Sequence, residues 1–375
     1  MKDGYWAIDC DLHIVEPDDL WLDYIDSRFA DRAPRKVATT AIDSFFLVDG
    51  RLAPRIPGDA LAAVQRYNAE LIRDQKRPEM TTGDFEATTV RRAMDAEGLD
   101  AAVLFPTSAL SVNEHEDLDP DFSHAIARAY NNWLADFIKS GDPDRMYGCG
   151  IVAIQSVDLA ADEIERVANL GFKAIVLRPN PPRLGCYFHH REFDKIWRTC
   201  ERLGLAVVFH EGAGSSRLSS GADRFRRGCE YAIWHAAAHP MEQMHAVAAM
   251  TLGGVMERFP NLRVGFLEAN CSWLPYWLWR LDEHWEFKGY LSPDEVTLPP
   301  SEYFKRQGWA SVESEETPVG KTIEQIGDSN IVFSTDWPHL DSAYPNSIRD
   351  FLSLEISADS KRKILWDNSM RLYNL

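Results

Sequence analysis

The residues with the clearest chemical potential are carboxylates and histidines that follow short apolar runs. Asp11 and His13 end the run YWAIDCDLH (5–13), and because alternate side chains of a strand point to the same face, the two could chelate one cation. His210 follows LAVVF, and Asp336 follows IVFST. Taken singly, each residue is also consistent with a turn cap or a core histidine. Together, two carboxylates and two imidazoles have the composition of an open divalent-metal site.

Eight apolar runs must position these side chains, and most are separated by stretches with helical periodicity. Alternating strands and helices form parallel βαβ units, and eight such units close into an α/β fold of the (β/α)8 TIM barrel type. A doubly wound open sheet is the alternative. Only a barrel brings the ends of the first, fifth, sixth and eighth strands to a common centre, so the polar residues favour the barrel. The runs are residues 5–13, 101–106, 146–154, 172–180, 205–212, 263–270, 308–314 and 330–339.

The whole chain, residues 1–375, is predicted to be one domain. Residues 14–98 separate the first two strands and contain a single strand-like run, SFFLVDG (44–50). We expect this insertion to form a cap over the barrel mouth. The helix expected after the third strand, DLAADEIERVANLG, has Asp158 in position to cap it.

Charge and composition limit the partners. The chain has 40 Lys and Arg against 58 Asp and Glu, a net charge of −18, which repels nucleic acid and anionic membrane surfaces. Neither is expected as a partner. No run reaches the ~18 apolar residues of a membrane span, and the N-terminus lacks the pattern of an export signal, which predicts a soluble cytoplasmic protein. The six cysteines, without a C-x-x-C, are interpreted as reduced thiols.

The order of the motifs resembles the amidohydrolase superfamily, in the amidohydrolase-2 branch related to aminocarboxymuconate semialdehyde decarboxylase. The motifs are D-x-D-x-H in the first run, H-E-G after the fifth, RFPNLRVGFLE leading into the sixth and STDWPH in the eighth. That branch typically binds its metal through H-x-H, a strand-five histidine and a strand-eight aspartate. The resemblance implies Asp11, His13, His210 and Asp336 as ligands, with Asp11 in place of the first histidine.

Two departures from this branch concern the chemistry. Glu268, in LEANCSW, stands where the branch usually has a histidine that acts as general acid/base or polarises a carbonyl. The resemblance therefore implies a changed proton-handling residue, with Glu268 and Asp336 as the catalytic candidates. Lys173 lies at the wrong end of the fourth run to become the carbamylated bridge of the two-zinc hydrolases.

The segment HAAAHPMEQMH offers a second pair of ligands. His239 and Glu242 lie three apart on one helical face, and Pro240 suits the first turn of that helix. The pair is either a solvated surface or a chelating one. If it chelates, it joins Glu268 and Asp336 in a set typical of non-heme iron centres that activate dioxygen. In these respects the chain is similar to a TIM-barrel lineage of non-heme diiron monooxygenases from diterpenoid biosynthesis that act mostly on CoA-linked acids.

Two further regions bear on partners. The loop after the fifth run is rich in arginine, which suits a phosphate such as that of CoA but also suits pairing with the protein's own acids. These residues are Arg217, Arg224, Arg226 and Arg227. The tryptophan-rich segment 273–285 favours a subunit interface, hence a homo-oligomer.

The leading prediction is thus an oxygenase with two non-heme iron ions that hydroxylates a hydrophobic carboxylic acid, as a CoA thioester, with dioxygen, as in terpenoid metabolism. Its predicted metal ligands are Asp11, His13, His210, His239, Glu242, Glu268 and Asp336. The alternative is a hydrolase or decarboxylase with one zinc or manganese ion, in which Asp336 or Glu268 moves the proton. A barrel that only binds a ligand is the third possibility.

Overall fold

The eight expected strands are all present in the computed structural model. They are β1 Ile8–Ile14, β5 Ala101–Pro106, β6 Met146–Ile151, β7 Ala174–Leu177, β8 Ala206–His210, β9 Val264–Leu267, β10 Gly308–Val312 and β11 Ile331–Phe333. They form one sheet in the order β1-β5-β6-β7-β8-β9-β10-β11, with every pair of neighbours parallel. The predicted (β/α)8 TIM barrel is therefore confirmed. The structure describes residues 1–39, 44–53, 85–112, 115–180, 185–211, 231–288, 295–339 and 342–375.

Hydrogen bonds from the segment after β11 bring the first and last strands together. The backbone N–H of His13 donates to the carbonyl of Trp337 at 2.8 Å. The Ser334 hydroxyl donates to the carbonyl of Asp11 at 3.2 Å, and the Thr335 N–H donates to the Asp9 carboxylate at 3.2 Å. The ends of β1 and β11, which carry the D-x-D-x-H and STDWPH motifs, consequently lie side by side.

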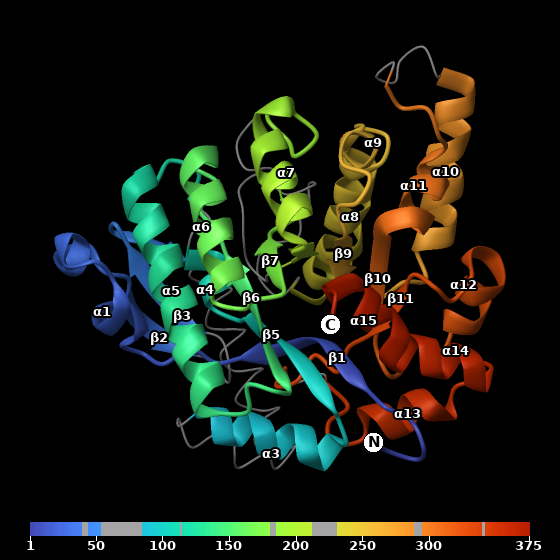
Figure 1. Cartoon of the computed structure of the whole chain (residues 1–375), viewed down its shortest axis with the longest axis horizontal. Helices are drawn as coiled ribbons and strands as arrows, with labels where there is room; N and C mark the ends of the chain where they lie inside the picture. Colours follow the sequence, from blue (N-terminus) through green and yellow to red (C-terminus); the bar gives the residue numbers. More distant parts are fainter. Residues whose placement is uncertain are drawn as a thin grey trace.

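Helices follow one another around the outside of the strands (Figure 1). They are α1 Leu20–Tyr24, α3 Ala87–Glu97, α4 Ala109–Val112, α5 Pro120–Ser140, α6 Val157–Asn169, α7 Asp194–Leu203, α8 Tyr231–Met250, α9 Val255–Arg258, α10 Leu274–Lys288, α11 Pro300–Gln307, α12 Val319–Ile326, α13 Ser347–Ser353, α14 Ala358–Arg362 and α15 Asn368–Tyr373. Every residue of β5, β7, β8, β9 and β10 is buried. This pattern is expected of parallel strands covered on both faces. Within the described chain, no helix is long and apolar enough to cross a bilayer.

Two local predictions about helix starts are wrong. Ser156, not Asp158, caps α6, because its hydroxyl accepts from the N–H of Leu159 while Asp158 lies in the first turn and pairs with Lys195. Pro240 lies inside α8 and not in its first turn. A proline removes one helical hydrogen bond. The helix α8 continues through Pro240 because packing of its buried face on the barrel offsets that loss.

The insertion between β1 and β5 contains more structure than the single strand predicted. Strands β2 Arg35–Thr39, β3 Ser44–Val48 and β4 Arg51–Ala53 form an antiparallel sheet. Trp21 packs edge-on against Phe46, which ties α1 to this sheet. The Arg32 guanidinium lies 4.1 Å from the ring centroid of Phe122, near the start of α5. These elements lie beside α5 (Figure 1), and the cap over the barrel mouth remains a prediction.

Candidate active site

Two histidines from opposite parts of the sequence face each other at the strand ends. The Nδ1 of His13 donates to the carbonyl of Pro106 at 2.9 Å, and the Nδ1 of His210 donates to the carbonyl of Glu211 at 2.7 Å. A carbonyl can only accept, so each neutral ring must carry its proton on Nδ1. The two Nε2 atoms lie only 3.0 Å apart. At this distance the two nitrogens share either a proton, which the raised pKa of His210 allows, or a cation.

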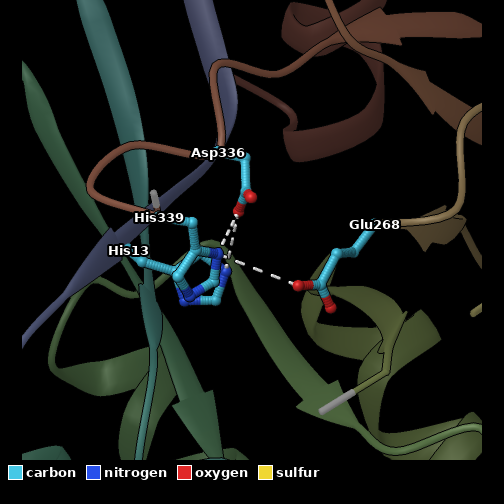
Figure 2. Close-up of side chains that lie close together, drawn as sticks. All are labelled: His13, Glu268, Asp336 and His339. Carbon is cyan, nitrogen blue, oxygen red and sulfur yellow. Dashed lines mark hydrogen bonds and ion pairs between the residues drawn. The ribbon is translucent and has the colours of Figure 1, made fainter. Parts of the chain in front are cut away.

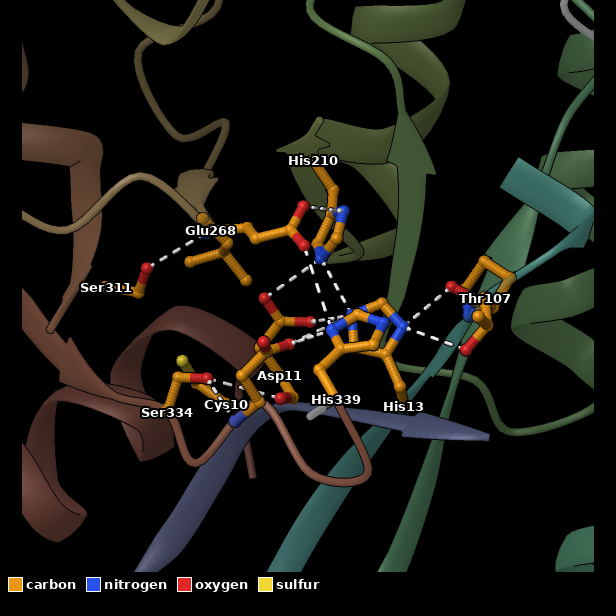
Figure 3. Close-up of polar contacts among 12 residues, drawn as sticks. Cys10, Asp11, His13, Thr107, His210, Glu268, Ser311, Ser334 and His339 are labelled. Carbon is orange, nitrogen blue, oxygen red and sulfur yellow. Dashed lines mark hydrogen bonds and ion pairs between the residues drawn. The ribbon is translucent and has the colours of Figure 1, made fainter. Parts of the chain in front are cut away.

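The carboxylate of Asp11 completes this arrangement (Figure 3). Its Oδ2 lies 3.1 Å from Nε2 of His210, and its Oδ1 lies 3.6 Å from Nε2 of His13. Oδ1 is buried and makes no hydrogen bond with any described residue. Each of the three residues offers one ligand atom, and these three atoms lie within 4.8 Å of one another. A buried, unsatisfied carboxylate oxygen beside two imidazole nitrogens is a donor set that fits a divalent cation.

Asp336 lies on the other side of His13, just beyond the end of β11. Its backbone has a φ of +53°, and its N–H donates to the Ser334 hydroxyl at 3.1 Å. Its Oδ1 lies 3.6 Å from Nε2 of His13. The four predicted ligands are therefore all close to Nε2 of His13, although their binding of a metal remains a prediction.

His339 belongs to this cluster, and sequence reasoning missed it. Its Nδ1 lies 2.6 Å from Oδ1 of Asp336, and its ring centroid is 4.3 Å from that of His13. Figure 2 shows His339 and Asp336 on the turn after β11. The signal was present in the motif STDWPH, where a histidine follows the aspartate by three residues across a turn.

Glu268 approaches from the opposite side, from the turn that follows β9 (Figure 2). Its φ is +54°, a left-handed conformation that is uncommon for residues other than glycine. Its N–H donates to the Ser311 hydroxyl at 3.1 Å, which fixes the turn to β10. Its Oε2 lies 3.2 Å from Nδ1 of His210, and its Oε1 lies 3.9 Å from Nδ1 of His339. The side chain thus reaches into the space beside the histidine pair.

The charges of the cluster favour a cation at its centre. Burial lowers the pKa of His210, but the Asp11 and Glu268 carboxylates outweigh it and raise that pKa to about 9. Burial and the neighbouring His339 hold the pKa of His13 well below its usual range. Burial raises the pKa of Glu268 well above its usual range; the neighbouring His210 and His339 oppose the rise, and the Asp336 and Asp11 charges add to it. Glu268 is consequently a carboxyl group that favours its protonated form.

The two residues of the predicted pair on α8 have different neighbours, and their binding of a metal remains a prediction. The Nδ1 of His239 donates to the carbonyl of His235 at 2.9 Å, which turns Nε2 towards Glu268, 3.6 Å from its Oε2. Glu242 is buried on the same helix, but it interacts with Glu211. Burial raises the pKa of Glu211 to about 7, and the charge of Glu242 adds to that rise. His239 therefore reaches the cluster. Among the described residues, Glu242 belongs to none of the groups of side chains that lie close enough together to hold a metal ion.

The predicted phosphate-binding arginines, Arg217, Arg224, Arg226 and Arg227, lie outside the described residues. The structure therefore does not test them. Among the described residues, five cysteines are buried and free, and their interpretation as reduced thiols remains a prediction.

Comparison with known proteins identifies the family. Residues 8–375 match the amidohydrolase family. The chain belongs to this family. It is 24% identical to 2-amino-3-carboxymuconate-6-semialdehyde decarboxylase of Dictyostelium discoideum over 254 aligned residues, and these residues cover 67% of each chain. It is 25% identical over 318 residues to gamma-resorcylate decarboxylase of Polaromonas sp. (strain JS666 / ATCC BAA-500), which covers 82% of this chain and 94% of the relative.

A solved structure with the same fold contains a metal. It is 5-carboxyvanillate decarboxylase from Novosphingobium aromaticivorans DSM 12444, in complex with manganese and 4-hydroxy-3-methoxy-5-nitrobenzoic acid. Its TM-score to this amidohydrolase is 0.72 at 21% identity, covering 100% of this chain and 97% of that one. The family match and the two decarboxylase relatives confirm the predicted resemblance to the branch of aminocarboxymuconate semialdehyde decarboxylase.

The prediction of a diiron monooxygenase is wrong. The two relatives named above are decarboxylases, which overturns the oxygenase and leaves dioxygen, CoA and two iron ions without support. The physical reason is that carboxylates and imidazoles bind manganese, zinc and iron alike. The composition of a ligand set therefore does not identify the metal or the reaction.

Proposed function

We propose that this amidohydrolase is a metal-dependent decarboxylase that holds one manganese or zinc ion. Its substrate class is a carboxylic acid whose carboxyl group is attached to a conjugated carbon, as in a hydroxybenzoate. The observation that carries the proposal is the pair of Nε2 atoms of His13 and His210, 3.0 Å apart beside Asp11, with Glu268 reaching in from the opposite side. The names of the relatives supply the reaction type.

The ligands differ from the proton donor in their surroundings. Asp11, His13, His210 and Asp336 would hold the ion, because their ligand atoms gather around Nε2 of His13. The hydrogen bond between His339 and Asp336 orients that carboxylate, which suits a ligand. When bound, a divalent ion supplies positive charge that orients and neutralises the substrate carboxylate.

The reaction itself is a replacement of the carboxyl group by a proton. The C–C bond to the carboxylate breaks, its electron pair remains on the ring carbon, carbon dioxide leaves, and a proton takes the vacated position. No oxidant or reductant is consumed. A carboxylic acid that can deliver a proton is the group required. Glu268 is the candidate, because its side chain reaches in beside the histidine pair and burial raises its pKa in the metal-free site. We therefore assign the proton transfer to Oε2 of Glu268, which makes no hydrogen bond with a described residue.

The test uses purified protein that is stripped with a chelator and reloaded with manganese or zinc. 2,6-Dihydroxybenzoate and 5-carboxyvanillate are supplied as probes, and carbon dioxide and the decarboxylated phenol are quantified with and without oxygen. We expect turnover that is independent of oxygen, abolished by chelation, and accompanied by about one metal ion per chain. In D2O the product should carry deuterium at the vacated carbon. Metal-loaded protein that releases no carbon dioxide above a His210→Ala control, from these probes or related hydroxybenzoates, would overturn the proposal.

A further inference from the structure

A buried carboxylate outside the metal cluster holds the turn after β5. Glu16 is only 2% exposed. Its Oε1 accepts from the N–H groups of Thr107 and Ala109, and its Oε2 accepts from the N–H of Ser108, each at 3.0 Å. Three consecutive backbone donors therefore converge on one side chain. Their arrangement fixes the path of the chain as it leaves β5 and enters α4.

The same turn supplies the acceptor that orients His13. Pro106 is the last residue of β5, and its carbonyl accepts from Nδ1 of His13 at 2.9 Å. The Thr107 hydroxyl lies 3.3 Å from the same nitrogen (Figure 3). His13 and Glu16 lie three residues apart in the sequence. The end of β1 and the residues that follow it therefore hydrogen-bond to the turn at two places. Moving the turn would move the partner of Nδ1.

This geometry matters because it sets the tautomer of a candidate ligand. While Pro106 accepts from Nδ1, the lone pair of His13 is on Nε2 and faces Asp11 and His210. Without that acceptor the ring is free to carry its proton on Nε2, where it would block the metal position. Residues that support metal ligands in this way typically change metal affinity about 10- to 100-fold when altered.

We propose that Glu16 is a positioning residue for the metal centre, which acts by holding the 106–109 turn and so keeps His13 in the tautomer that presents Nε2. The hydrogen bonds of the Glu16 side chain go to the backbone of this turn, at Thr107, Ser108 and Ala109. This role rests on the proposed metal-dependent function, but it concerns metal affinity and not the identity of the substrate.

The substitution Glu16→Gln isolates this role. Glutamine keeps an oxygen that can still accept from Thr107 and Ala109, but its amide group opposes the N–H of Ser108, so one donor turns away. We expect the Kd for Mn2+, measured by titration with electron paramagnetic resonance, to rise about 10-fold or more. At saturating manganese, kcat should change less than about 3-fold, because the loaded centre contains the same residues as before.

The matched control is Glu163→Gln. Glu163 is equally buried and holds Asn131 and Arg166 between α5 and α6, away from the cluster. Both variants should lower Tm, but the control should leave the Kd for Mn2+ unchanged. A drop in Tm without a change of Kd in Glu16→Gln, or an equal change of Kd in both variants, would show that Glu16 is merely structural.

A second measurement separates this inference from the proposed function. In 15N-labelled apoprotein, the His13 ring signals, assigned by their loss in His13→Gln, should report a proton on Nδ1 in the wild type and a tautomer mixture in Glu16→Gln. An unchanged tautomer would overturn the positioning role, whether or not the protein decarboxylates any probe. If Glu16→Gln does not fold, Glu16→Asp, which keeps the carboxyl group but shortens the reach, is measured in its place against the same expectation.

Discussion

The two sides of the candidate site are built differently. On one side, Asp11, His13 and His210 come from strands, and each side chain is 1% exposed. On the other, Glu268 and Asp336 are carried by turns with positive φ, and their side chains are 15% and 12% exposed. The strand side is the more deeply buried of the two, which suits a metal ligand. The turn side is more exposed, which suits a group that transfers a proton, and Asp336 lies next to both His13 and His339.

The largest effect is expected on the strand side, from His210→Ala. Loss of a residue that supports a ligand typically lowers metal affinity about 10- to 100-fold. Removing an imidazole ligand from a buried centre should lower the affinity further, and decarboxylation should fall below detection. Circular dichroism should show the barrel intact, because strand-end residues at this face serve chemistry more than stability. Metal that stays bound, or protein that becomes insoluble, would mean that His210 is a structural residue.

On the turn side, Glu268→Gln should separate chemistry from metal binding. The amide has the same shape but cannot release a proton, so kcat should fall about 10²- to 10⁴-fold, the usual contribution of a general acid. Metal content should stay at about one ion per chain, as in the wild type. Loss of the ion in this variant would place Glu268 among the ligands and erase the contrast between the two sides.

The same contrast explains which parts the sequence predicts. Along a strand, side chains alternate between faces, so the spacing of Asp11 and His13 defines their common direction and the apolar runs locate all eight strands. A turn has no such period. His339 reaches the cluster because the chain folds back after Asp336, and sequence spacing does not determine that path. The reaction could not be predicted from the sequence either, since the same ligand types bind several metals.

His339→Phe tests the junction between the two sides. The ring would still pack near His13, but it would no longer donate to Oδ1 of Asp336. We expect metal affinity to fall about 10-fold, with a smaller change of kcat at saturating manganese. Isothermal titration with Mn2+ measures the first quantity and steady-state kinetics the second. The reverse split, with intact affinity and lost kcat, would make His339 part of the proton-transfer machinery.

A smaller effect is expected from His239→Ala. His239 lies 3.6 Å from Oε2 of Glu268 and belongs to no metal-type group of the described residues. Metal analysis should still give about one ion per chain, and kcat should fall about 10-fold or less as the Glu268 carboxyl loses a neighbour that limits its orientation. Loss of one of two ions per chain would restore the second metal position predicted on α8.

The smallest effect is expected from Glu242→Gln, which completes the test of the α8 pair. Glu242 lies one helical turn from His239, and its charge raises the pKa values of Glu211 and Tyr187. The amide is isosteric, so packing is retained, and removing a charge that opposes ionised Glu211 offsets any hydrogen bond lost. We therefore expect metal content and kcat/KM to stay within about 3-fold of the wild type, less than 1 kcal/mol in transition-state stabilisation. If Glu242→Gln lost metal while His239→Ala retained it, the site would extend towards Glu211, and the division into strand and turn sides would have to be redrawn around α8.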